Sequence, residues 1–149
     1  MPFNDSSAPK NAKNANGAVL RTRTKVSQTI LIVDDETDVA EVCARVLKRA
    51  GFNCLVAHDS PAAIAMVDSD APDLVLSDIN LPTADGYEIA RYVRRKSPAT
   101  LIILMTTNHN PSVPGDALRA GASGCLSKPF SNTELVTAIR SLLGAAFRP

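Results

Sequence analysis

The chain has 149 residues, of which 45% are hydrophobic and 21% are charged, and its formal net charge is +1. This length suits one globular domain, and the near-neutral charge argues against a chain that is basic throughout and wraps nucleic acid. Apolar runs such as Leu101–Met105 are far shorter than the roughly 20 residues that a membrane-spanning helix needs.

The first 27 residues show no helical or strand periodicity and contain Pro2, Pro9 and Gly17. We therefore predict a flexible arm over residues 1–27 and one domain over residues 28–147. The arm carries a net charge of +4, whereas the rest of the chain carries −3. A solvated tail is one reading of the arm, and a weak anchor to nucleic acid, a membrane or an acidic partner is the alternative.

Five short apolar runs, each bounded by polar or turn-forming residues, are predicted as buried β-strands. They cover residues 28–33, 53–57, 73–77, 100–105 and 124–127. An amphipathic segment follows each run, so that strands and helices alternate along the chain. This alternation predicts an α/β fold with a doubly wound parallel sheet and helices on both of its faces.

The helices are read from apolar stripes and end signals. The first helix ends before Gly51, and its predicted inner stripe is Val39, Val42, Cys43, Val46, Leu47 and Ala50. Ser60 followed by Pro61 predicts the N-cap and first helical residue of a second helix that runs to about Val67. The other helices are expected over residues 85–95, 114–120 and 132–146, and the fourth is short because it follows a proline-rich segment.

Polar residues stand where the predicted strands end. Asp34 and Asp35 follow the first strand, Asp78 the third, Thr106 the fourth and Lys128 the fifth. In a parallel sheet these ends meet at one edge, where ligands bind. Converging carboxylates repel each other unless they share a hard cation, and oxygen ligands in an open cleft suit Mg²⁺.

The same set of residues suits phosphoryl transfer. A carboxylate oxygen is a competent nucleophile toward phosphorus and would give an acyl phosphate. Mg²⁺ and the Lys128 ammonium would neutralise charge on the oxygens of the transferring group, and the Thr106 hydroxyl would donate a hydrogen bond to one of them.

Taken together and in order, these motifs resemble the receiver domain of bacterial two-component response regulators. The resemblance extends from Thr29 to about Leu143. It rests on Ile30-Leu31-Ile32-Val33-Asp34-Asp35-Glu36, Leu74-Val75-Leu76-Ser77-Asp78-Ile79-Asn80-Leu81-Pro82, Asp85-Gly86, Thr106 and Lys128-Pro129-Phe130. It implies a flavodoxin-like strand order 2-1-3-4-5.

The resemblance also assigns roles to residues. It makes Asp78 the phosphoacceptor, and Asp35 together with Asp78 the direct ligands of Mg²⁺. It makes Asp34 an outer ligand acting through water, and the backbone carbonyl of Asn80 a further ligand. Thr106 and Lys128 would sense the phosphoryl group, and the resemblance implies a cis peptide bond before Pro129.

Two features depart from the family pattern. Cys125 stands where many receivers have an aromatic residue that changes rotamer on activation, and its short side chain cannot swing a ring between two states. The segment 108–115 contains two prolines and a glycine in place of the first turn of the fourth helix. We therefore hypothesise that the signal travels through this loop, which orders on phosphorylation.

We expect a single-domain response regulator in the cytoplasm that is not an enzyme in the usual sense. Asp78 would accept a phosphoryl group from a sensor histidine kinase or a histidine phosphotransfer protein, with self-catalysed transfer and autodephosphorylation. The output would be binding of a downstream protein target or onward transfer of the phosphoryl group. Residues outside the domain are too few for a helix-turn-helix, so we expect no direct DNA binding.

Two alternatives stay open. The first is an interaction module of the same fold that works without phosphorylation, although no residue of the site is missing. The second is a Mg²⁺-dependent aspartyl phosphatase, which commonly needs a second aspartate two residues after the nucleophile, where this chain has Asn80.

Overall fold

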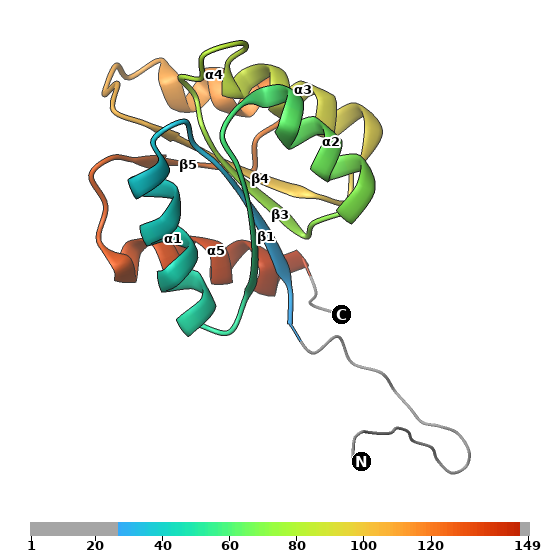
Figure 1. Cartoon of the computed structure of the whole chain (residues 1–149). Coiled ribbons are helices and arrows are strands. Elements are labelled where there is room, and N and C mark those ends of the chain that lie inside the picture. Colours follow the sequence, from blue (N-terminus) through green and yellow to red (C-terminus); the bar gives the residue numbers. More distant parts are fainter. Residues whose placement is uncertain (1–26, 147–149) are drawn as a thin grey trace, which may run out of the picture.

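The structure is a computed structural model that describes residues 27–146. Its centre is one sheet of five parallel strands in the order β2-β1-β3-β4-β5 (Figure 1). The strands are β1 (Thr29–Val33), β2 (Asn53–Ala57), β3 (Leu74–Asp78), β4 (Leu101–Thr106) and β5 (Gly124–Ser127). The predicted fold class and strand order are confirmed.

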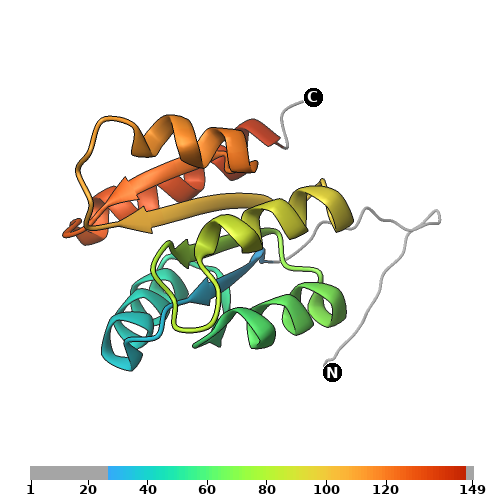
Figure 2. The ribbon, with the colours of Figure 1, turned by 90° about the horizontal axis from the view of Figure 1, so that it is seen from above.

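Five helices cover the two faces of this sheet. They are α1 (Thr37–Arg49), α2 (Ser60–Asp70), α3 (Gly86–Lys96), α4 (Val113–Ala120) and α5 (Asn132–Ala146). The helices α1 and α5 pack on one face, and α2, α3 and α4 pack on the other, with α3 between α2 and α4 (Figure 2). None of the helices within residues 27–146 is long and apolar enough to cross a membrane.

The core consists of two apolar layers separated by the sheet. Along β1, Ile30 and Ile32 face α1 and α5, whereas Leu31 and Val33 face α2, α3 and α4. All four side chains are fully buried, which is why the strand reads as an uninterrupted apolar run. Burying each such side chain stabilises the fold by roughly 1.5–3 kcal/mol relative to exposure.

The ends of α2 differ from the prediction. The N-cap is Asp59, whose carboxylate accepts a hydrogen bond from the Ala62 backbone N–H at 2.9 Å, so the predicted cap at Ser60 is wrong. Asp59 has extended backbone angles that aim its side chain at the open first turn, whereas Ser60 is already helical and buried. The helix continues past Val67 to Asp70 and ends at Ala71, which has φ +45°.

The inner face of α1 also differs from the prediction. Its buried residues are Ala40, Cys43, Ala44 and Leu47, whereas Val42 is 48% exposed. The helical period places positions 40, 43, 44 and 47 on one stripe, and small alanines there let the helix approach the sheet. Val42 therefore lies on the flank of α1, and its predicted position on the inner stripe is wrong.

The remaining boundaries lie within one or two residues of those predicted. The fourth helix is short, as expected, and begins at Val113 rather than Pro114. The predicted arm lies outside the described residues apart from Ser27, and so does Phe147 at the end of the predicted domain.

The start of α3 lies directly against the end of β3. The Gly86 backbone N–H donates a hydrogen bond to the Ile79 carbonyl at 2.8 Å. A Cβ atom placed on Gly86 would lie 2.5 Å from the Asp78 carbonyl oxygen and 3.0 Å from the Ile79 Cα. Both neighbours are backbone atoms, so this close approach requires glycine.

We predict that Gly86→Ala lowers the free energy of unfolding by about 1–3 kcal/mol, because the methyl group forces the two backbones apart. Urea unfolding followed by circular dichroism measures this change. Gly144→Ala is the matched control, since a Cβ atom there has no neighbour within 4 Å and α5 gains a better helix former. Equal stability of the two variants would contradict the role of Gly86.

Candidate functional site

The predicted site residues come together at the carboxyl edge of the sheet. Asp34 follows β1, Asp78 is the last residue of β3, Thr106 is the last residue of β4, and Lys128 follows β5. The parallel register brings these ends side by side, with Asp78 opposite Met105 and Thr106 opposite Ser127. Residues as far apart in the chain as Asp34 and Lys128 therefore contact each other.

Three carboxylates form the acidic part of the site. One oxygen each from Asp34, Asp35 and Asp78 lies within 4.8 Å of the other two. The Asp34 side chain is fully buried, that of Asp78 is nearly so, and Asp35 is exposed to solvent. The cluster thus has a buried floor and one side open to water.

The Lys128 ammonium lies between the two buried carboxylates. Its Nζ donates hydrogen bonds to Oδ2 of Asp34 and to Oδ2 of Asp78, each at 2.8 Å. Burial alone would lower the pKa of Lys128, but the hydrogen bonds and charges of Asp34 and Asp78 outweigh it and raise that pKa above its ordinary value. The lysine is therefore a fixed positive charge at neutral pH.

Backbone groups hold the other oxygens of the same carboxylates. Oδ1 of Asp34 accepts a hydrogen bond from the Glu36 N–H, and Oδ1 of Asp78 accepts one from the Asn80 N–H, both at 2.9 Å. Each buried carboxylate is thus oriented by one backbone donor and one ammonium. Among residues 27–146, none donates a hydrogen bond to the carboxylate of Asp35.

The donor set fits Mg²⁺. Three carboxylates and one ammonium leave a formal charge of −2, which a divalent cation neutralises. Mg²⁺ prefers oxygen ligands and keeps several waters, and the exposed side of Asp35 leaves room for them. Asp34, Asp35, Asp78 and the carbonyl of Asn80 remain the predicted ligands.

Thr106 closes the site on the side of β4. It is 3% exposed, and its Oγ1 accepts a hydrogen bond from the Asn108 N–H at 2.9 Å. Its carbonyl accepts a hydrogen bond from the Lys128 N–H at 2.7 Å, so the two residues are tied through the backbone. The peptide bond between Lys128 and Pro129 is cis, as the resemblance implied.

A hollow of about 150 Å³ lies beside Cys125. It is lined by Thr106, Ser127 and most residues of the segment 108–114, so it connects the buried threonine with the loop before α4. No aromatic ring fills it, because Cys125 occupies the position where one was expected from the family. The hollow gives the loop room to move toward Thr106 without displacing a ring.

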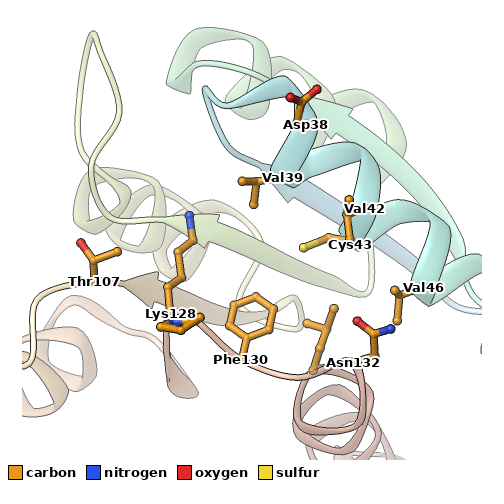
Figure 3. Close-up of a pocket in the computed structure, with 11 residues that line it drawn as sticks. Asp38, Val39, Val42, Cys43, Val46, Thr107, Lys128, Phe130 and Asn132 are labelled. Atoms are coloured by element: carbon orange, nitrogen blue, oxygen red, sulfur yellow. The ribbon is translucent and has the colours of Figure 1, made fainter.

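A larger apolar groove of about 490 Å³ begins at Lys128 and runs between α1 and the start of α5 (Figure 3). Val39, Val42 and Val46 line it from α1, and Phe130 and Leu135 line it from the other side. Sequence reasoning missed this groove because it assigned the three valines to the inner stripe of the helix. The signal was their offset: positions 39, 42 and 46 each precede a buried position (40, 43 and 47) by one residue, which turns them toward the flank of the helix.

The comparisons with known proteins agree on one family. A family model described as the response regulator receiver domain matches residues 30–140. The phosphate regulon transcriptional regulatory protein PhoB of Pseudomonas aeruginosa is 38% identical over 120 residues, which are 79% of this chain and 52% of that protein. The response regulator MprA of Mycobacterium tuberculosis is 36% identical over 118 residues, covering 79% of this chain and 51% of that protein.

Solved structures give the same result. The chemotaxis response regulator CheY4 of Vibrio cholerae has a TM-score of 0.74 and 29% identity, covering 78% of this chain and 98% of that one. A putative response regulator of Chloroflexus aurantiacus has a TM-score of 0.75 and 32% identity, covering 79% of this chain and 98% of that one. The chain spans about half the length of the curated relatives it matches.

We predict that amide hydrogen exchange over residues 107–120 slows when Mg²⁺ and beryllofluoride, a phosphoryl mimic, are added. The helix α4 has only 8 residues, its N-cap Ser112 makes no side-chain capping bond, and the loop before it is exposed. Such a segment opens easily, and a new contact at Thr106 would order it. Mass-spectrometric exchange measures the change, and Asp78→Asn, which cannot hold the mimic, is the control. Unchanged exchange in the original chain would contradict a loop-borne signal.

Proposed function

Since this chain belongs to the response regulator receiver family, we propose that it works as a phosphorylation-dependent switch with Asp78 as the phosphoacceptor. The observation that carries the proposal is the position of the Asp78 carboxylate. It lies between the Lys128 ammonium at 2.8 Å and the carboxylates of Asp34 and Asp35 within 4.8 Å. This arrangement supports the proposal, because the Asp78 carboxylate lies beside a fixed cation and beside carboxylates that suit a second one.

The proposed step is transfer from a phosphohistidine. A carboxylate oxygen of Asp78 forms a bond to phosphorus while the bond from phosphorus to the imidazole nitrogen breaks. The electron pair of that bond stays on the imidazole, and the product is an acyl phosphate on Asp78. Lys128 stabilises the negative charge on the phosphoryl oxygens, and the Thr106 hydroxyl donates a hydrogen bond to one of them.

Asp34, Asp35, Asp78 and the carbonyl of Asn80 would hold Mg²⁺ beside the reacting carboxylate. When bound, the ion supplies charge neutralisation for the transferring group. The described residues contribute orientation: the Asn80 N–H and Lys128 fix the Asp78 carboxylate, and the Glu36 N–H fixes Asp34.

We predict that the chain gains one phosphoryl group when it is incubated with Mg²⁺ and a small phosphodonor such as acetyl phosphate. Intact mass spectrometry detects the added group, and chelation of Mg²⁺ should abolish it. Asp78→Asn removes the nucleophile and should prevent the gain, whereas Asp70→Asn, at the exposed end of α2, should not. Phosphorylation of the Asp78→Asn chain would refute the assignment.

The apolar groove supports a protein as the physiological phosphodonor. It begins at Lys128 and carries Val42, which is one of the two large apolar residues exposed within residues 27–146. The groove ends at Lys128, whose ammonium contacts Asp78, so a helix lying in the groove can present a phosphohistidine to Asp78. An apolar face on that helix would bury the groove. The occupant we propose is therefore the helix of a sensor histidine kinase or histidine phosphotransfer protein.

We predict that Val42→Glu slows transfer from a phosphorylated kinase by at least about tenfold, because the groove then buries a charge. The rate with acetyl phosphate should not change, since the site itself is intact. Leu118→Glu is the matched control, because Leu118 is 66% exposed on α4, on the other face of the sheet. Radiolabel transfer from a kinase that phosphorylates the original chain measures both rates. Equal slowing by the two variants would remove the groove from the donor interface.

The proposal includes a single-domain protein in the cytoplasm that has no substrate turnover of its own. The chain matches the chemotaxis response regulator CheY4 over 98% of that chain, and PhoB and MprA over about half of their length, so the receiver is the part that it shares with all three. Asn80, two residues after Asp78, argues against a phosphatase, which commonly has a carboxylic acid there. The output would pass through protein contacts or onward phosphoryl transfer.

A further inference from the structure

The exposed face of α3 carries a row of basic side chains that the phosphorylation site does not use. Arg91, Arg94 and Arg95 stand at positions i, i+3 and i+4, and Lys96 follows them. All four are exposed, and no ion pair joins any of them to a carboxylate of residues 27–146. They are therefore positive charges that a partner can neutralise.

The neighbouring helices extend this row. Arg119 of α4 and Arg91 flank a hollow of about 330 Å³ between α3 and α4. The stem of Arg94 lies against Gly121, so its side chain follows the same junction. Arg119 also pairs with Asp116 within α4, which leaves part of its charge neutralised.

On the side of α2, the carboxylate of Asp68 is already hydrogen-bonded to Tyr92. The Tyr92 hydroxyl donates hydrogen bonds to both carboxylate oxygens of Asp68 at 2.8 Å. The Arg95 guanidinium lies over the Tyr92 ring, 5.8 Å from its centre, rather than beside the acid. This cation–π contact fixes the stem of Arg95 while its N–H donors stay available.

The basic end of α3 lies at the amino ends of the strands, where β1 begins at Thr29 and β4 begins at Leu101. The Thr29 N–H donates to the Asp73 carboxylate at 2.8 Å, and the Asp73 carbonyl accepts from the Leu101 N–H at 3.1 Å. Leu101 follows the short turn in which Ser97, just after α3, is hydrogen-bonded to Thr100. The basic end of α3 therefore lies near the starts of β1, β3 and β4, at the end of the sheet opposite Asp78.

We infer that this basic α3 face, formed by Arg91, Arg94, Arg95, Lys96 and Arg119, binds nucleic acid through its phosphates. Guanidinium groups bind phosphate in a bidentate manner, and four of the five residues are arginine. A row of cations along one helix suits a linear polyanion.

A membrane surface fits the same face less well. An interfacial helix needs an apolar face, whereas α3 shows no large exposed apolar side chain; within residues 27–146 these are Val42 on α1 and Leu118 on α4. The expectation of no direct DNA binding concerned a helix-turn-helix that reads base edges. Phosphate binding needs no such element and carries no sequence specificity.

The test measures binding of the full, unphosphorylated chain to a labelled single-stranded RNA of mixed sequence by fluorescence anisotropy at several salt concentrations. The variant R91A/R95A/K96A removes three charges and keeps Arg94, which packs on Gly121. It should bind at least about tenfold more weakly at low salt, and its plot of log affinity against log salt should be shallower by about 2. The matched control R45A/K48A/R49A removes three exposed charges with similar helical spacing from α1, on the other face of the sheet and away from Arg94 and Arg119, and should bind like the original chain.

Three results would overturn the inference. The first is no binding of RNA by the original chain at low salt, and the second is an equal loss of affinity in the α3 and α1 variants. The third is α3-dependent binding that is tighter to anionic phospholipid vesicles or to polyglutamate than to RNA, which would assign the face to a membrane or an acidic protein. Circular dichroism of each variant verifies that it is folded. The outcome does not depend on phosphorylation of Asp78.

Discussion

Two buried carboxylates, those of Asp34 and Asp78, share the ammonium of Lys128, and the carboxyl edge of the sheet is organised around this contact. Each N–O distance is 2.8 Å, and the Asp34 side chain is fully buried. A buried carboxylate without a partner would cost several kcal/mol, so removal of the lysine would leave both acids unfavourably placed. The contact also sets the chemistry, because the same ammonium that stabilises the acids lies where a phosphoryl group would carry negative charge.

This arrangement depends on features far from the charges. Parallel pairing of β1, β3, β4 and β5 is what brings four strand ends to one edge, and fully buried apolar residues on both faces hold the strands in register. Gly86 lets α3 begin directly against the Asp78 backbone. The backbone donors from Glu36 and Asn80 then fix the carboxylates. The site is therefore held by main-chain geometry at almost every point.

Much of this could be predicted from the sequence, because apolar runs alternated with amphipathic segments and each polar site residue stood at the end of a run. The strands over Asn53–Ala57 and Gly124–Ser127 were predicted to the residue. The misses have local causes. Ser60 and Asp59 are both residue types that cap helices well. Only the backbone angles show that the Asp59 carboxylate, and not the Ser60 hydroxyl, faces the first turn. Val42 was misplaced because the sequence alone does not distinguish a valine on the flank of a helix from one on its buried face.

The groove and the basic α3 face lie beyond what periodicity can show, because both are formed by side chains from separate elements. The chain has a net charge of +1, yet its acidic carboxyl edge and its basic α3 face are two chemically distinct regions. The acidic carboxyl edge and the basic end of α3 lie at opposite ends of the strands, since α3 runs back from the Asp78 end toward the start of β4. Attraction between them is weak, because charges separated by more than the Debye length of about 10 Å at 0.1 M salt are screened. A cation or phosphoryl group at one end and a polyanion at the other can therefore bind without competing for the same charges.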